Sequence, residues 1–180
     1  SNPNGVRFFF EAFFDTFSDI RSLGFIRIAA VGNSTAKELK QFYLTTDLVP
    51  DEANADSLAV ALVETESLDS AKVLLVTGNL GRDVLFRKLE EARAIVDRFE
   101  VYKTEASDLS KNPAAKMFRE HGADAILFTS SSGVTSFVNQ AKDLVLEPEA
   151  LRPKSVSIGP ITSASMVQQG MPMNFQAKEA

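Results

Sequence analysis

The sequence predicts an α/β fold with mainly parallel strands. Apolar runs of strand length alternate along the chain with segments whose apolar residues recur at helical spacing. Residues 28–36 are typical of such a unit: a buried strand, a tight turn at Gly32 and a polar helix start. A near-copy at residues 155–164 places Gly159 in the same position, 127 residues later. Two such turns on one chain predict two similar lobes.

Composition excludes several classes of function. The chain has 180 residues, of which 44% are hydrophobic, so it can bury a substantial core. It has no cysteine and a single histidine, His121, which excludes disulfides, thiolate chemistry, multi-histidine metal sites and an ordinary Ser-His triad. No apolar run approaches the roughly 20 residues of a membrane span. The net charge of −5 argues against general nucleic-acid binding but not against a small anionic ligand. We expect a soluble protein of a reducing compartment.

The first half of the chain opens with a phenylalanine-rich helix. Phe9, Phe13 and Phe17 share one face of it, which predicts an amphipathic helix packed on the core. The expected helices are residues 7–17, 35–43, 55–64 and 83–96, and the expected strands are residues 25–31, 46–50, 72–77 and 99–104.

The second half follows a polar linker at residues 105–113 and repeats features of the first. Gly5-Val6 recurs as Gly133-Val134, each pair followed by an apolar helix. We expect His121 to end a helix before Gly122. The expected helices are residues 114–121, 134–145 and 162–169, and the expected strands are residues 124–129, 153–158 and 173–176.

Several short motifs occur in a fixed order along nearly the whole chain. They are Pro3–Arg7 before the phenylalanine-rich helix, Ala30–Ala36, Val76–Leu80 with Arg82, Val101–Thr104, Phe128–Val134 and Ile158–Thr162. Each motif alone is weak evidence, but their order and spacing together resemble the uroporphyrinogen-III synthase family.

This resemblance implies two flavodoxin-like lobes with parallel sheets, one inserted in the other, joined by a two-stranded ribbon with a cleft between them. On that template residues 1–100 are the inner lobe, 101–112 the ribbon or linker, and 113–180 the outer lobe. The family's first inner strand, its first two outer strands and its last helix have no counterpart here. The resemblance therefore implies an incomplete outer lobe and a chain truncated at both ends, which could be inactive.

The resemblance also implies an activity. The family is a cofactor-independent lyase of haem and sirohaem biosynthesis that cyclises the linear tetrapyrrole hydroxymethylbilane to uroporphyrinogen III, with loss of water and inversion of ring D. A cytoplasmic monomer without nucleic-acid or membrane partners is expected on this template.

Helix N-termini are the natural recognition device for a substrate rich in carboxylates, because their first N–H groups lack partners and carry partial positive charge. N-capping is the alternative role for each of these residues, and it is weaker for Thr35 and Thr162 because they hold matched positions in the two copies. The candidate substrate-binding residues are Asn33, Ser34, Thr35, Gly78, Asn79, Ser130, Ser131, Ser132, Ile161 and Thr162.

Tyr102 is the one residue that the sequence suggests as a catalytic acid. A phenol stays protonated at neutral pH and can protonate the leaving hydroxyl; its alternative role is a strand tyrosine that packs at an edge. Tyr43 is interpreted as amphipathic packing late in a helix. Arg82 either pairs with a substrate carboxylate or lies solvated on the surface.

Two other functions compete with the synthase. A non-catalytic two-lobe module that binds anions would use the same helix ends without depending on Tyr102. A nucleotide-binding Rossmann domain is weaker, because no Gly-x-Gly-x-x-Gly follows a strand.

Overall fold

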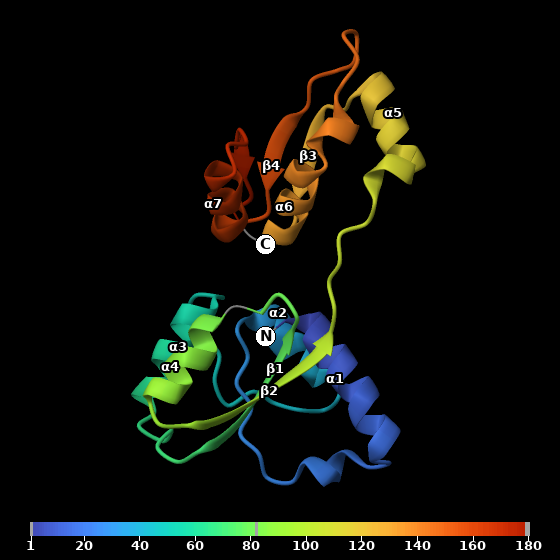
Figure 1. The fold of residues 1–180 in the computed structure, drawn as a ribbon. Helices are drawn as coiled ribbons and strands as arrows, with labels where there is room; N and C mark the ends of the chain where they lie inside the picture. The colour runs from blue at the N-terminus through green and yellow to red at the C-terminus, as the bar shows by residue number, and fades with distance from the viewer. Residues whose placement is uncertain (1, 82, 179–180) are drawn as a thin grey trace. The chain divides into compact units, whose positions relative to one another are not determined.

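The computed structural model describes residues 2–81 and 83–178 (Figure 1), and the chain divides into two compact units, Ser1–Thr104 and Glu105–Ala180. Each unit is described by itself. All strand pairs among the described residues are parallel, and helices alternate with strands along the chain. The predicted α/β class with parallel sheets is therefore confirmed.

Unit 1 is built around two parallel strands that pair in one register from Lys72↔Ile95 to Thr77↔Glu100, after which a shift brings Gly78 opposite Tyr102. Figure 1 shows α3 and α4 together on one side of these strands and α1 on the other. The elements of unit 1 are α1 (Pro3–Thr16), η1 (Ile20–Leu23), α2 (Asn33–Lys40), α3 (Ala55–Glu64), β1 (Lys72–Gly78), α4 (Asp83–Glu91) and β2 (Ile95–Tyr102).

Two apolar clusters hold unit 1 together. One joins α3 and α4 to the strands through Leu58, Leu85 and Leu89. The other packs α1 against α2, where Phe10 and Phe13 are buried and the Phe10 ring stacks on Phe42 with 4.1 Å between centroids. Of the predicted stripe, Phe13 is buried and Phe9 packs partly buried on this cluster, whereas Phe17 is 43% exposed, so the prediction is confirmed only in part.

The strands expected at residues 25–31 and 46–50 are wrong as full strands. Only one parallel bridge, Ala29↔Leu48, joins the two segments. Phe25 and Ile26 are exposed, so the apolar run that predicts a buried strand lies partly in solvent. A strand requires a ladder of partners, and the apolar pattern alone does not tell how many partners the fold supplies.

Two helix ends also differ from the prediction. The helix expected over residues 83–96 ends at Glu91, because Arg93 takes a left-handed conformation with φ of 64° and Val96 lies in β2. Similarly, α2 ends at Lys40. Tyr43 has φ of 59° and is 96% exposed, so its interpretation as packing late in a helix is wrong.

Unit 2 contains a three-stranded parallel sheet in the order β3-β4-β5. Its helix expected over residues 134–145 begins at Ser131 and is split at Gln140 into α6 and a 3-10 helix. His121 ends α5 before Gly122, which has φ of 70°, so that prediction is confirmed. The elements are η2 (Leu109–Lys111), α5 (Pro113–His121), β3 (Ala125–Phe128), α6 (Ser131–Asn139), η3 (Ala141–Leu144), β4 (Lys154–Ser157), α7 (Pro160–Gln168) and β5 (Phe175–Gln176).

The two faces of the unit 2 sheet differ. Phe128 on one face is buried in a cluster with Val134 of α6 and Met166 of α7. On the other face, Leu127, Val156 and Phe175 stand opposite one another across the three strands. Leu127 is 69% exposed and Phe175 56% exposed. Parallel sheets are normally covered on both faces, so this apolar row is unusual.

Candidate functional site

Tyr102 is the last residue of β2, and it pairs with Gly78 at the end of β1. Its phenol oxygen accepts a hydrogen bond of 2.6 Å from the side-chain amide of Asn2. Its ring lies 5.7 Å from that of Phe8 on α1. The ring also lies directly against Gly78, where a Cβ atom would collide with the ring carbons, so this close approach requires glycine. The ring of the predicted acid is thus held at the carboxyl end of the unit 1 strands.

Gly78 and Asn79, given as a candidate helix end, lie ahead of α4, which begins at Asp83 as expected. Asn79 instead clamps the chain as it leaves β2. Its side-chain oxygen accepts from the Thr104 N–H at 2.7 Å and its amide nitrogen donates to the Thr104 carbonyl at 3.2 Å. Its backbone N–H also donates to the Tyr102 carbonyl at 3.2 Å. The side-chain amide of Asn79 therefore holds the segment that follows Tyr102.

The predicted helix start at residues 33–35 is the first turn of α2. Gly32 is the N-cap, and no side chain caps this helix. The first N–H groups of a helix have no acceptor within it, so the amides of Asn33, Ser34 and Thr35 are available for a ligand. Asn33 and Ser34 are exposed, whereas Thr35 is 4% exposed.

The matched turn in unit 2 has the same construction. Gly159 is the N-cap of α7, again without a side-chain cap, and Pro160 has no N–H to satisfy. The amides of Ile161 and Thr162 are therefore the open ones, and Thr162 is 4% exposed, like Thr35. Behind this turn, the buried Ser163 hydroxyl lies 2.6 Å from that of Ser157 on β4 and donates to the Gln176 side chain at 2.7 Å, which anchors α7 on the sheet.

The three predicted site serines at the start of α6 have different roles: Ser130 caps the helix, and Ser131 contacts α7. Ser130 caps α6 by accepting from the Gly133 N–H at 3.1 Å, so its alternative capping role is realised, and its hydroxyl lies 3.1 Å from that of Ser132. The Ser131 hydroxyl donates to the Ile161 carbonyl at 3.4 Å. The starts of α6 and α7 consequently lie side by side.

The open helix starts differ from the other helices whose N-cap residue is described. Asn2, Asn54, Asn112 and Ser130 each cap their own helix with a side-chain oxygen. Among the α-helices whose N-cap residue is described, only α2 and α7, which have a glycine N-cap and belong to the sequence repeat, lack such a cap. An anion can occupy the position that a capping oxygen takes elsewhere.

An ion pair joins α1 to α2 behind the first open turn. Arg7 donates to both carboxylate oxygens of Glu38, at 2.7 and 3.0 Å. The Glu38 side chain is only 8% exposed. The hydrogen bond from Arg7, assisted by its charge, holds the pKa of Glu38 below its usual value despite partial burial. This pair fixes α2 relative to α1.

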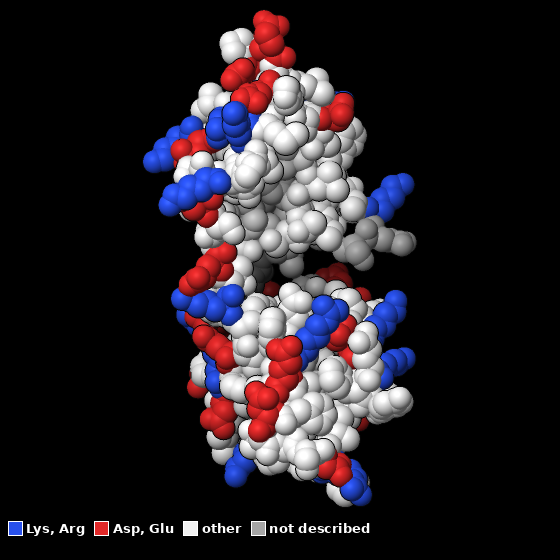
Figure 2. Space-filling model, turned by 90° about the vertical axis from the view of Figure 1, so that its right-hand side faces the viewer, with Lys and Arg blue, Asp and Glu red and all other residues white. Residues whose placement is uncertain are grey.

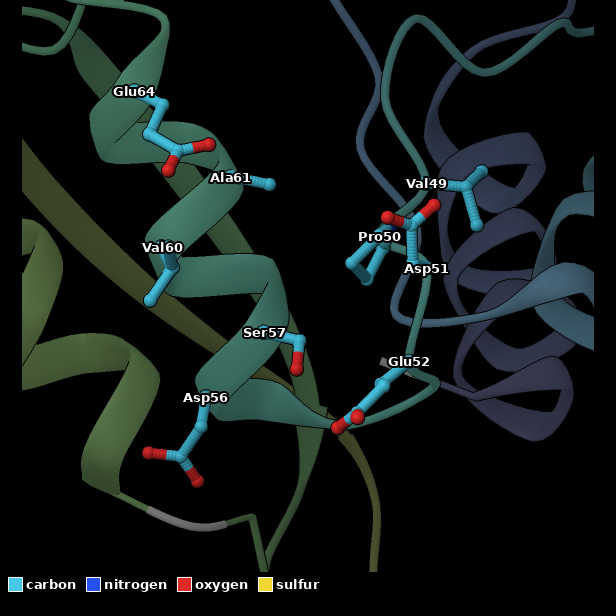
Figure 3. A pocket seen from close by; sticks show the side chains of 9 residues that line it. All are labelled: Val49, Pro50, Asp51, Glu52, Asp56, Ser57, Val60, Ala61 and Glu64. Carbon is cyan, nitrogen blue, oxygen red and sulfur yellow. The ribbon is translucent and has the colours of Figure 1, made fainter.

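Figure 3 shows a separate open pocket of about 480 Å³ between α3 and the loop before it. Its carboxylate-bearing lining residues are Asp51, Glu52, Asp56 and Glu64. Carboxylates would repel an anionic ligand, and none of the predicted site residues lines this pocket. Within the described residues, no group of three or more His, Asp or Glu could hold a metal ion. On the face in Figure 2, acidic and basic side chains are interspersed.

The family model for "Uroporphyrinogen-III synthase HemD" matches residues 2–180. This chain belongs to that family. The match confirms the resemblance inferred from the sequence motifs. The synthase fold is also seen in the solved structure of a mutant uroporphyrinogen III synthase from the bacterium Thermus thermophilus, with a TM-score of 0.67 and 20% identity over 98% of this chain and 69% of that one.

Sequence relatives in the synthase family are distant and longer. The chain is 29% identical over 147 residues to the porphyrin biosynthesis protein HemD of Ruminiclostridium josui, which covers 82% of this chain but 29% of that protein. It is 24% identical over 177 residues to the uroporphyrinogen-III synthase of Chlorobaculum parvum, covering 97% of this chain and 70% of that one. The chain thus spans under a third of the first relative and about two thirds of the second.

The candidate residues of this synthase-family chain fall in both units. Unit 1 carries Asn33, Ser34, Thr35, Gly78, Asn79 and Tyr102, and unit 2 carries Ser130, Ser131, Ser132, Ile161 and Thr162. Arg82 lies outside the described residues. Sequence reasoning missed Asn2, the partner of the Tyr102 hydroxyl. The internal repeat could have pointed to Asn2, because Asn2 lies 128 residues before Ser130 and both are the N-cap residues of matched helices.

None of the helices in the described ranges is long and apolar enough to cross a membrane.

Proposed function

We propose that this chain catalyses the reaction of its family's namesake: closure of hydroxymethylbilane to uroporphyrinogen III, with loss of water and inversion of ring D. Unit 1 and unit 2 would be the inner and outer lobes of the two-lobed family architecture. The reaction is proposed to need no metal or organic cofactor and to take place in the cytoplasm. The observation that carries the proposal is the matched pair of open helix starts, at α2 and α7, in a chain that the family model matches over residues 2–180.

The open helix starts would bind substrate carboxylates. Each amide–carboxylate interaction at a helix N-terminus contributes about 0.3–1 kcal/mol, so several are needed to hold a flexible tetrapyrrole. Thr35 and Thr162 stand third in their helices, and no hydrogen bond occupies either hydroxyl among the described residues. Both hydroxyls can therefore donate to a carboxylate as well.

Tyr102 would act as the general acid. Its phenol gives a proton to the hydroxyl of the ring A hydroxymethyl group, the carbon–oxygen bond breaks, and water leaves with formation of an azafulvene cation. The substituted carbon of ring D attacks this cation. The resulting spiro intermediate opens and recloses with ring D inverted, and the proton that the new macrocycle loses restores the phenol. Without control of conformation the substrate closes with ring D uninverted, so binding geometry supplies the rest of catalysis.

The test is the isomer formed from hydroxymethylbilane. We expect the protein to yield isomer III, and Tyr102→Phe to slow its formation by about 100-fold, within the range typical of a lost general acid. Tyr43→Phe is the matched control, because Tyr43 is the other tyrosine and is exposed, and it should retain the full rate.

A protein that yields only the uninverted isomer would contradict the proposal. A protein that binds the linear tetrapyrrole without converting it, equally well with Tyr102→Phe, would favour a non-catalytic anion-binding module.

A further inference from the structure

The side-chain amide of Asn2 makes two hydrogen bonds that differ in direction. Its oxygen accepts from the Gly5 N–H at 2.8 Å and so caps α1. Its nitrogen lies 2.6 Å from the Tyr102 phenol oxygen. Because a backbone N–H can only donate, the capping bond fixes which end of the amide is oxygen. The nitrogen must therefore face Tyr102, so Asn2 donates and the phenol oxygen accepts.

This direction decides where the proton of Tyr102 can go. A phenol has one proton, and the Asn2 nitrogen cannot accept it. The proton is thus directed away from Asn2 and is available to another acceptor. When the phenol gives its proton away, its oxygen becomes an anion, and a hydrogen bond from Asn2 to that oxygen becomes charge-assisted and stronger.

The internal repeat shows that capping alone does not require an asparagine. Ser130 holds the matched position at α6, 128 residues later, and caps the Gly133 N–H through its hydroxyl. A serine that caps a helix has no second polar group, whereas a capping asparagine still has its NH₂ group to donate. The nitrogen of Asn2 is therefore an addition specific to unit 1, and its partner is Tyr102.

The rest of Tyr102 is held by other contacts. Phe8 and Gly78 flank the ring, and the Asn79 N–H holds the carbonyl of Tyr102. These contacts fix the plane of the ring but leave the hydroxyl proton free to rotate about the carbon–oxygen bond. The hydrogen bond from Asn2 restricts this rotation, because it favours orientations in which the phenol proton points away from the Asn2 amide.

We propose that Asn2 is a positioning residue for Tyr102: its amide aims the phenol proton away from α1 and toward the substrate, and holds the oxygen after the proton has left. This inference rests on the proposed role of Tyr102 as the acid. It predicts that removing the Asn2 NH₂ donor, while keeping an oxygen that caps α1, lowers the rate because Tyr102 becomes a poorer acid.

Asn2→Asp separates the two roles of Asn2. The carboxylate keeps an oxygen for the Gly5 N–H, since aspartate is as good an N-cap as asparagine, but it accepts the phenol proton instead of donating to the phenol. We expect Asn2→Asp to lower kcat for isomer III by about as much as Tyr102→Phe, with KM and melting temperature nearly unchanged. In a Tyr102→Phe background, Asn2→Asp should cause no further loss.

Two further variants control for capping and charge. Asn54→Asp makes the same substitution at the α3 cap, where Asn54 accepts from the Ser57 N–H at 2.8 Å, and it should leave the rate unchanged. Asn2→Ser copies Ser130, so it retains a cap and lacks both the donor and the added charge. It should lose kcat like Asn2→Asp, and it serves as the test if Asn2→Asp fails to fold.

A readout without turnover tests the hydrogen bond itself. Tyrosine labelled with ¹³C at Cζ gives two NMR signals, because Tyr43 and Tyr102 are the chain's only tyrosines. Asn2→Asp should move the Tyr102 signal and leave that of the exposed Tyr43 in place. An active wild type slowed by Tyr102→Phe but not by Asn2→Asp or Asn2→Ser would overturn the inference, as would multiplying losses in the double variant. A wild type that yields only the uninverted isomer contradicts the proposed function instead.

Discussion

At the scale of single residues, the position of Tyr102 depends on the absence of a side chain at position 78. The ring occupies the space that a Cβ atom would need, and the two residues are paired across β1 and β2. Interiors pack at crystal-like density, so one added methyl group must displace either the ring or the strand. Gly78 is therefore part of the Tyr102 environment although it has no functional group.

Gly78→Ala should destabilise the protein by about 1–3 kcal/mol, the usual cost of overpacking a filled site. Urea unfolding measures it. Gly5→Ala in the same unit is the control, since an added Cβ there meets only the Asn2 side-chain oxygen at 3.5 Å, and alanine is favoured in a helix. Equal stability of wild type and Gly78→Ala would show that the ring can move aside without cost.

Sequence reasoning reached Tyr102 but not its environment. The motif around Val101–Thr104 singled out the tyrosine, whereas Asn2 lies 100 residues away in sequence and no local pattern links the two. The threonines at 35 and 162 were found because a repeat is visible in the sequence itself. The sequence could not tell which helix starts are capped, because capping depends on whether a side-chain oxygen accepts a hydrogen bond from the first backbone N–H groups of the helix.

At the scale of elements, α2 is oriented by its ion pair with α1. Glu38 is nearly buried and accepts both bonds from Arg7. A charge in such a position is stabilising only while its partner is present. The first turn of α2, with its open amides, thus depends on an interaction at the other end of that helix.

The Arg7–Glu38 pair predicts a specific dependence of stability on pH. Because Arg7 lowers the pKa of Glu38 in the folded state, the stability from this pair is present above the unfolded carboxyl pKa of about 4.3 and is lost as pH falls through the lower folded value. Thermal melts of Glu38→Gln should lie below wild type at neutral pH and converge with it in acid. Asp19→Asn, which removes the exposed Asp19–Arg21 pair, should change the melting temperature little. A Glu38→Gln deficit that persists unchanged in acid would contradict the ion-pair origin.

Elements were predicted best where they carry their own boundary signals. The helix at 55–64 follows the capping Asn54, and the strand at 72–77 is a continuous apolar run that ends at a glycine. The helix expected to continue to Val96 failed because Val96 keeps helical spacing with Leu85 and Leu89, while the break at Arg93 has neither glycine nor proline to mark it. The run at 25–31 failed because strand pairing depends on distant partners.

At the scale of the whole molecule, each unit has its own buried cluster. The clusters around Leu89 and Phe10 lie wholly in unit 1, and the cluster around Met166 lies wholly in unit 2. The repeat in the sequence predicts two similar lobes, with residues 1–100 in one and 113–180 in the other. It could not indicate how completely each sheet is covered, since coverage depends on the packing of distant segments.

The apolar row of the unit 2 sheet, Leu127, Val156 and Phe175, is a surface through which molecules of this protein can associate with one another. Exposed apolar surface of this kind promotes association between molecules. Light scattering should therefore show self-association that rises with protein concentration, and Leu127→Thr should reduce it. Val167→Thr, which alters a similarly exposed residue on α7, is the control and should have little effect because it lies outside the row. If both variants scatter like wild type, association does not proceed through this face. If Leu127→Thr alone stays monodisperse, the exposed Leu127 side chain on β3 limits the solubility of the whole protein.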